Sequence, residues 1–357
     1  MEGPTGAPNN RLIDIKSFTL DELTERLESL GKARFRATQI FKWLYKRDAA
    51  GFEEMTDLSM ALRQELAESF AINRFPVLDS QKSEDGTEKL LLGLPDGENV
   101  EVVLIPGEHG RLTLCISSQI GCKLKCGFCR TGTMGFTRDL TSGEIVEQVQ
   151  AAGRYLGGDT RERITNLVLM GMGEPLLNYD NVVRAIRTMY TEHGLNYSSR
   201  KITISTAGVL PAMERLGREI EVSVAISLHA VDNETRSMLM PINKKYPIEA
   251  LMEVCRNYPL GTRRRLTFEY LLIHGVNDSL EDAKKLAKLM RTVKSKVNLI
   301  PFNRFEGCSW EPPDWDHILA FQKVLLDGSV TTIIRKSRGE DILAACGQLK
   351  SRHQRKS

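Results

Sequence analysis

Short apolar runs alternate with amphipathic stretches between residues 112 and 335. The apolar runs predict buried β-strands over 112–117, 166–170, 201–205, 222–228, 266–273, 297–301 and 330–335. Helical periodicity fills several of the intervals, over 142–155, 179–190, 248–255 and 280–292. This alternation is typical of βα units around a parallel sheet, although periodicity alone does not separate an open sheet from a partial barrel.

The pattern is different before residue 112. Apolar residues recur at helical spacing over 12–75, where Thr19 followed by Glu22 indicates a capping box. Two strand-like runs, 89–94 and 100–105, flank a Pro-Asp-Gly-Glu turn and predict a β-hairpin. We therefore expect the following organisation: a disordered N-terminus over 1–11, a small helical domain over 12–78, a β-hairpin linker over 79–107, the main α/β domain over 108–349 and a basic tail over 350–357.

The composition, with 41% hydrophobic and 27% charged residues, excludes a largely disordered chain. The net charge of +3 is too small to attract nucleic acid by itself, so an RNA partner would have to meet local basic patches. One such patch, residues 31–47, contains six Lys or Arg and no acid, interleaved with Phe35, Phe41, Trp43 and Tyr45. It is either an RNA-binding surface or a solvated helix face whose aromatic residues pack inward.

Cysteine usage favours a reducing compartment. Three of the seven cysteines lie within eight residues, whereas a secreted disulfide scaffold would space them differently. Residues 1–10 lack the basic and apolar regions of a secretory signal, and no apolar run is long enough to span a bilayer. We expect a cytoplasmic protein without a membrane partner.

The three clustered cysteines, Cys122, Cys126 and Cys129, follow the first strand of the main domain. Thiolates at this spacing can each bind one iron of a [4Fe–4S] cluster, which leaves the fourth iron without a protein ligand. S-adenosylmethionine (SAM) can chelate that iron and, after receiving an electron, give a 5′-deoxyadenosyl radical. The alternatives are three packed free cysteines or a zinc knuckle, but zinc sites usually need a second Cys-x-x-Cys pair, which is absent.

Polar residues follow several predicted strands, at the end where βα barrels bind their ligands. Gly173 would let the backbone approach a ligand closely, and Glu174 could accept hydrogen bonds from the methionine ammonium of SAM. An ordinary turn is the alternative for this segment. The other candidates are Ser205, Ser227, Leu228, His229 and Asn303. For His229 the alternative is a structural histidine, and for Asn303 a turn residue.

Two of the remaining cysteines have unusual positions. Cys115 lies in the first strand of the main domain, and Cys346 follows Arg335, Lys336 and Arg338. A positive neighbourhood favours the thiolate form of a cysteine. The other two, Cys255 and Cys308, are expected to be small buried hydrophobic residues.

These motifs resemble the RlmN family of radical SAM methyltransferases. The matching segments run in order between residues 12 and 349 and include 113–122, the three-cysteine loop, 171–175, 227–229, 241–245 and 338–348. The family methylates C2 of adenine in 23S rRNA and tRNA. The resemblance implies an α/β fold with a partial (βα)6 TIM-type barrel and an N-terminal helical RNA-binding domain.

The resemblance also implies a mechanism that uses two SAM molecules per turnover. The first would methylate Cys346, and the second, cleaved at the cluster, would supply the radical that removes hydrogen from the S-methyl group. The carbon radical would add to C2, and Glu101 would remove the C2 proton. Cys115 would then attack the sulfur of Cys346, releasing the product and leaving a transient disulfide. The implied partners are 23S rRNA, tRNA and an electron donor such as flavodoxin or ferredoxin, and the implied state is a monomer.

Two other functions share part of this residue set. Methylation of the same adenosine at C8, which gives antibiotic resistance, would use the same cysteines, although residues 173–178 look more like those of the C2 enzymes. A non-catalytic iron–sulfur protein that binds RNA or transfers electrons would not need Cys115, Cys346 and the SAM pocket together.

Overall fold

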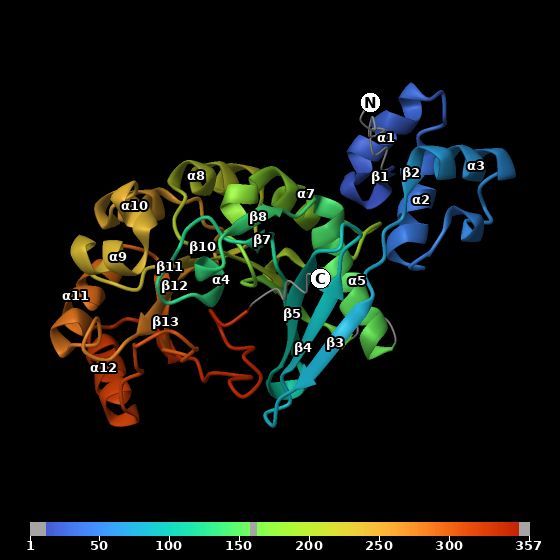
Figure 1. Ribbon diagram of the computed structural model, residues 1–357. Helices are drawn as coiled ribbons and strands as arrows, with labels where there is room; N and C mark the ends of the chain where they lie inside the picture. Colours follow the sequence, from blue (N-terminus) through green and yellow to red (C-terminus); the bar gives the residue numbers. More distant parts are fainter. Residues whose placement is uncertain (1–11, 158–162, 350–357) are drawn as a thin grey trace, which may run out of the picture.

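A ten-stranded sheet forms the centre of the computed structural model, which describes residues 12–157 and 163–349 (Figure 1). The tails expected over 1–11 and 350–357 lie outside the described residues. Seven neighbouring strands are parallel: β6 (Leu112–Cys115), β9 (Asn166–Leu169), β10 (Ile202–Thr206), β11 (Ser223–Ser227), β12 (Leu266–Leu272), β13 (Ser295–Pro301) and β14 (Thr332–Ile334). These strands follow the predicted apolar runs, and their apolar side chains are largely buried.

Helices connect the parallel strands and cover the outside of the sheet (Figure 1). They are α5 (Ser142–Leu156), α7 (Tyr179–Tyr190), α8 (Leu210–Glu219), α9 (Asn233–Leu239), α10 (Ile248–Asn257), α11 (Leu280–Met290) and α12 (Trp315–Asp327). The order of the described strands ends at β14 on one side and β3 on the other, so the barrel stays open. The prediction of a partial (βα)6 barrel is confirmed.

The predicted hairpin is present but is not a separate linker. Strands β4 (Glu88–Gly93) and β5 (Asn99–Pro106) are antiparallel, and β3 (Val77–Lys82) precedes them as a further strand. Strand β5 also pairs with β6, which places Val103 opposite Cys115. Strand β5 joins the main sheet because residues 100–104 are all buried, so both faces of this strand must be covered.

Three helices, α1 (Leu20–Ser29), α2 (Phe35–Tyr45) and α3 (Met60–Ser69), form the N-terminal part, beside α5 in Figure 1. The capping box at Thr19 and Glu22 is confirmed. The strand β1 (Ile13–Asp14) pairs with β2 (Phe70–Ala71), which ties the two ends of this part together. No helix in the two described ranges is both long and apolar enough to cross a membrane.

Buried charges join the N-terminal part to α5. The ammonium of Lys16 pairs with Glu147, and both side chains are inaccessible to solvent. The Lys16 ammonium also donates to the carbonyl of Asn73 (3.1 Å), and Arg154 bridges Glu147 and Asp48. The orientation of the small domain against the barrel is therefore fixed by hydrogen-bonded charges as well as by apolar packing.

Glu147→Ala is expected to lower the free energy of unfolding by about 3–5 kcal/mol, because it leaves Lys16 buried without its counter-charge. Chemical denaturation of the intact protein, followed by circular dichroism, measures the change. Glu25→Ala on the exposed face of α1 is the matched control and should stay within about 0.5 kcal/mol of the parent. Equal stability of the two variants would contradict the role given to the buried pair.

Candidate functional site

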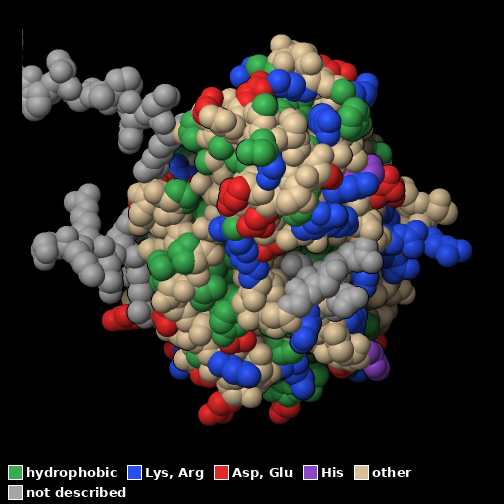
Figure 2. Space-filling view, turned by 90° about the vertical axis from the view of Figure 1, so that its right-hand side faces the viewer, with side chains coloured by type: hydrophobic (Ala, Val, Ile, Leu, Met, Phe, Trp, Pro, Cys, Tyr) green, Lys and Arg blue, Asp and Glu red, His purple; other side chains and the backbone are tan. Residues whose placement is uncertain are grey.

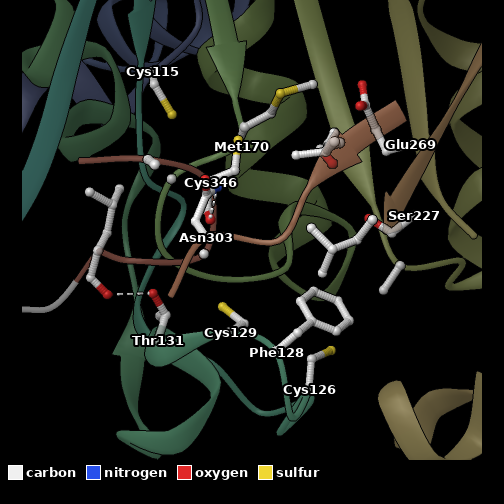
Figure 3. Close-up of a pocket in the computed structure, with 18 of the residues that line it drawn as sticks. Cys115, Cys126, Phe128, Cys129, Thr131, Met170, Ser227, Glu269, Asn303 and Cys346 are labelled. Atoms are coloured by element: carbon white, nitrogen blue, oxygen red, sulfur yellow. Dashed lines mark hydrogen bonds between the residues drawn. The ribbon is translucent and has the colours of Figure 1, made fainter. Parts of the chain in front are cut away.

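A cavity lies at the C-terminal ends of the parallel strands and collects most of the predicted site residues (Figure 3). The predicted residues that line it are Cys115, Cys122, Cys126, Cys129, Gly173, Glu174, Ser205, Ser227, His229, Asn303 and Cys346. Two predicted residues, Glu101 and Leu228, are not part of its wall. The side chain of Leu228 is buried in the core, and its backbone N–H donates to Glu269.

A short antiparallel ribbon holds the three-cysteine loop. It consists of β7 (Gln119–Gly121) and β8 (Phe136–Asp139), on either side of the loop. The N–H of Cys122 donates to the carbonyl of Gly135 (2.8 Å). Gly121 has φ 75°, and a Cβ there would lie 2.0 Å from the same carbonyl oxygen, so the ribbon requires glycine at this position. Strands of three and four residues have too little periodicity to be predicted, and the sequence analysis missed both.

The three clustered thiols all line the cavity. Among the residues that the structure describes, no group of three Cys, His, Asp or Glu side chains is already arranged to hold a metal ion. In a [4Fe–4S] cluster each thiolate binds a different iron atom. Burial raises the pKa of Cys122 to about 12 and raises the pKa values of Cys126 and Cys129. Bound iron would offset that cost of forming buried thiolates.

Glu174 is held rigidly at the cavity wall. Its two carboxylate oxygens accept the N–H groups of Leu176 (3.0 Å) and Ala207 (2.7 Å). Burial raises its pKa to about 6, although these hydrogen bonds act in the opposite direction. Gly173 has φ 99°, and a Cβ would lie 2.5 Å from the Cβ of Gln119. The loop can therefore pass this closely over β7 only with glycine at 173, and this contact places Glu174.

His229 serves both as a structural anchor and as part of the cavity wall. Its Nδ1 accepts the N–H of Leu271 (3.0 Å), so the neutral ring carries its proton on Nε2. Burial lowers the pKa of His229 to about 3, which keeps the ring neutral at physiological pH. Its ring also makes an edge-to-face contact with the ring of Phe128, and the two ring centroids are 4.7 Å apart. Phe128 lies between two of the clustered cysteines in the sequence. His229 is therefore suited to donate one hydrogen bond to a ligand and unsuited to act as an acid.

The segment that carries Cys346 crosses the open side of the barrel. It leaves β14, reaches the turn between β3 and β4, and returns over the three-cysteine loop, as the red trace in Figure 1 shows. At the turn, Asp341 accepts a hydrogen bond from Ser83 (2.6 Å), and the Lys89 ammonium donates to the carbonyl of Ile342 (2.6 Å). At the cysteine loop, Arg130 N–H donates to the carbonyl of Gly347 (2.7 Å).

Asn303 belongs to the same anchoring system. Its amide nitrogen donates to the carbonyl of Cys346 (3.2 Å), and its amide oxygen accepts the hydroxyl of Ser337. The side chain predicted to bind SAM thus contacts the segment that carries Cys346 at two points. The turn-residue alternative is not supported, because both ends of the amide reach the segment that carries Cys346.

The two lone thiols face the same cavity (Figure 3). Cys115 is buried at the end of β6, whereas Cys346 is accessible to solvent. Burial raises the pKa of Cys115 to about 12. The Cys346 residue as a whole is exposed, but the atoms around its thiol desolvate it and raise its pKa, while the guanidinium of Arg335 lowers the pKa of both thiols. Arg335 in turn lies 3.8 Å from the carboxylate of Glu269. Sequence analysis missed Glu269, although a lone acid inside a buried strand was a usable signal.

Glu101 lies on β5, outside the cavity wall. It is buried, its carboxylate is 3.4 Å from the ammonium of Lys89, and its carbonyl accepts the hydroxyl of Ser117 (3.0 Å). Lys89 is also an anchor of the Cys346 segment. The structure therefore connects Glu101 to that segment, and its role as the base that removes the C2 proton stays a prediction.

The basic patch at 31–47 separates into two kinds of residue. Phe41, Trp43 and Tyr45 are buried, so these aromatic rings pack inward. Phe35 is 56% exposed, and the exposed basic residues include Arg34, Lys42 and Arg47. Figure 2, which faces this end of the molecule, shows Lys and Arg side chains interspersed with acidic ones. The packing alternative holds for three of the four aromatic residues, while Arg34 and Lys42 keep exposed charged side chains.

Comparisons with known proteins agree with this geometry. Residues 116–289 match the Radical SAM superfamily, and residues 13–72 match the ribosomal RNA large subunit methyltransferase N-terminal domain. The dual-specificity RNA methyltransferase RlmN of Geobacter sulfurreducens is 52% identical over 341 residues, covering 96% of this chain and 93% of the relative. That of Syntrophotalea carbinolica is 50% identical over 340 residues, covering 95% and 90%. A radical SAM methyltransferase from Sphaerobacter thermophilus superposes with a TM-score of 0.86 at 43% identity, covering 94% and 98%.

Proposed function

The chain belongs to the RlmN family of radical SAM RNA methyltransferases, and from that premise we propose that it methylates C2 of adenosine. The proposed targets are an adenosine in the peptidyl-transferase centre of 23S rRNA and the adenosine next to the anticodon in some tRNAs. The observation that carries the proposal is that Cys346 and Cys115 share one cavity with the three clustered cysteines. In the sequence, however, these two cysteines lie near opposite ends of the barrel domain. A protein that only bound RNA would need neither lone thiol.

The chemistry of adenine explains the two thiols. C2 carries no acidic proton and is electrophilic, so SAM cannot methylate it by polar transfer, whereas a carbon radical can add to it. When bound, the cluster and SAM supply that one-electron chemistry. Cys122, Cys126 and Cys129 would hold the cluster, and Glu174 would accept the methionine ammonium. The remaining SAM contacts are assigned to Gly173, Ser205, Ser227, His229 and Asn303. Leu228 is left out, because it lies outside the cavity wall and its backbone N–H and carbonyl already bond to Glu269 and Arg236.

The residues of the chain perform the remaining steps. Cys346 accepts a methyl group, and its sulfur then links the protein to the RNA while the new C–C bond forms, which fixes the reacting carbon in position. Glu101 takes the C2 proton while the adduct radical gives up one electron, for which the bound cluster would be the acceptor. The Cys115 thiolate then attacks the sulfur of Cys346, so an S–S bond replaces the S–C bond. The electron pair of the S–C bond stays on the methylene carbon, which takes up a proton as the methylated base leaves. A flavodoxin or ferredoxin is the proposed reductant, and a cytoplasmic monomer the proposed state.

Nucleoside analysis tests the proposal and its nearest rival together. The anaerobically reconstituted enzyme is given SAM, a reductant and RNA that lacks the modification, and the digested product is compared with 2-methyladenosine and 8-methyladenosine standards by mass spectrometry. We expect 2-methyladenosine from both 23S rRNA and tRNA. A product that migrates with 8-methyladenosine would assign the chain to the C8 reaction.

Methylation of Cys346 is expected to become about tenfold faster per pH unit from neutral pH upward, because the thiolate is the nucleophile. Burial raises the pKa of the Cys346 thiol, so the thiol form dominates at neutral pH. The thiolate fraction therefore keeps increasing at pH values where an ordinary cysteine is already fully ionised. Arg335→Met removes the charge that lowers this pKa and should move the profile to higher pH. The mass of the intact protein after incubation with SAM measures methyl uptake. A rate that is independent of pH would contradict this dependence.

The N-terminal part, residues 12–78, is proposed to bind RNA through its exposed cations. Replacing Arg34 and Lys42 by Gln should reduce the slope of log affinity against log salt concentration by about 0.7–0.9 per charge. Lys285 and Lys288, on the exposed face of α11 at the far end of the barrel, provide the matched control (Figure 1). Equal slopes for both double variants would leave the RNA contact of this segment without support.

A further inference from the structure

Arg236, on α9, is a buried cation without an acidic partner. It is 1% exposed and is one of the largest side chains enclosed in the core. Its guanidinium donates to five oxygens: the carbonyls of Ala207 (2.9 Å), Ser227 (3.1 Å), Leu228 (3.1 Å) and Tyr246 (3.4 Å), and the side-chain oxygen of Asn243 (2.9 Å). All five acceptors are neutral. Within the described residues no carboxylate pairs with Arg236, so its positive charge lacks a partner in the polypeptide.

An unbalanced buried charge is costly, by several kcal/mol even after the protein relaxes around it. Hydrogen bonds to carbonyl dipoles recover part of this cost but leave the net charge in place. A neutral side chain could join the strand ends at lower cost. The burial of Arg236 therefore indicates an anion nearby that the polypeptide itself does not provide.

The position of Arg236 identifies that anion. Its partner Ala207 and the residues Leu239 and Met240 pack with Cys126 in one buried cluster, and of these only Leu239 does not line the cavity. Gly127, next to Cys126, donates its N–H to the carbonyl of Leu239 (3.0 Å), so the three-cysteine loop rests directly on the helix that carries Arg236.

We propose that Arg236 is the built-in counter-charge of the iron–sulfur cluster and raises its reduction potential. Three thiolates give the cluster a net negative charge, and reduction adds one more electron. A fixed positive charge behind one of its ligands stabilises the reduced form more than the oxidised form. The inference follows from membership of the radical SAM superfamily and does not depend on which adenine carbon is methylated. A positioning role for Arg236 at the ends of β10 and β11 is the competing explanation.

The midpoint potential of the reconstituted holoenzyme, measured by redox titration with EPR detection of the reduced cluster, separates the two explanations. Arg236→Gln removes the charge and should lower the equilibrium constant for one-electron reduction about tenfold, a shift of about 59 mV to more negative potential. Arg236→Lys keeps the charge but loses most of the hydrogen bonds. It should therefore be less stable to heat while its potential stays close to that of the parent.

A second pair of variants keeps the test valid if Arg236→Gln fails to fold or to hold iron. Cys255 lies buried on α10, where Arg236 lowers its pKa against the effect of burial. Cys255 is none of the five acceptors of Arg236, so Cys255→Asp would add a negative charge within electrostatic reach of the guanidinium and leave those acceptors in place, and Cys255→Asn is the neutral control of the same shape. We expect the Asp variant alone to show the negative shift. Equal potentials for these two variants, or equal shifts for Arg236→Gln and Arg236→Lys, would overturn the proposal and leave only the positioning role.

Discussion

Cys115→Ala is expected to accumulate covalently bound to RNA, whereas Cys346→Ala is expected to form no such adduct and no methylated product. Without Cys346 the pathway has no methyl acceptor. Without Cys115 every step up to the adduct can proceed, but no thiol remains to attack the sulfur and release the base. The structure supports this division, because both thiols line the cavity while only Cys346 is on the segment that crosses the barrel opening.

A denaturing gel of each variant, expressed with cellular RNA, measures the difference. Cys115→Ala should give a shifted band that ribonuclease removes, and its release step should be slowed by at least about a thousandfold, as is typical when a catalytic nucleophile is lost. Cys308→Ala is the matched control, because Cys308 packs near the site without lining the cavity. If Cys115→Ala still cleaves SAM but shows no ribonuclease-sensitive band, the adduct mechanism does not apply to this protein.

The second large effect concerns the clustered cysteines. Replacing Cys122, Cys126 and Cys129 together by Ala should remove bound iron and sulfide and abolish formation of 5′-deoxyadenosine. The fold should survive, since the β7–β8 ribbon and the barrel core do not depend on these three side chains. Iron analysis after anaerobic reconstitution and detection of 5′-deoxyadenosine give the two readouts, and circular dichroism checks the fold. Retention of iron at the level of the Cys308→Ala control would contradict the assignment.

The parallel strands were predictable because each is a local apolar run. The interval 266–273, for example, corresponds to β12, whose side chains are nearly all buried. The ribbon around the cysteine loop was not predictable, because its short strands owe their pairing to backbone hydrogen bonds and to Gly121 rather than to an apolar pattern. Strand β5 was predicted as half of a hairpin, but its pairing with β6 is a long-range contact that periodicity does not report.

In the candidate site, too, local sequence patterns were predictable and long-range contacts were not. Spacing alone identified the three cysteines, and a strand end identified Glu174. The approach of Cys346 to Cys115 came only from the family resemblance, since it depends on anchors such as Ser83 and Lys89 that are far away in sequence. Arg236 carries no sequence signal, because an arginine in a polar helical segment is usually exposed.

The Cys346 segment, which crosses the barrel opening, also has a fixed place in the order of synthesis of the protein. The segment follows every strand of the sheet, so it leaves the ribosome after all of them, and its anchor at Ser83 was made 258 residues earlier. Under the mechanism proposed above, a nascent chain that stops before this segment would have every strand of the barrel and the cysteine loop but no methyl acceptor, and we expect it to methylate no RNA.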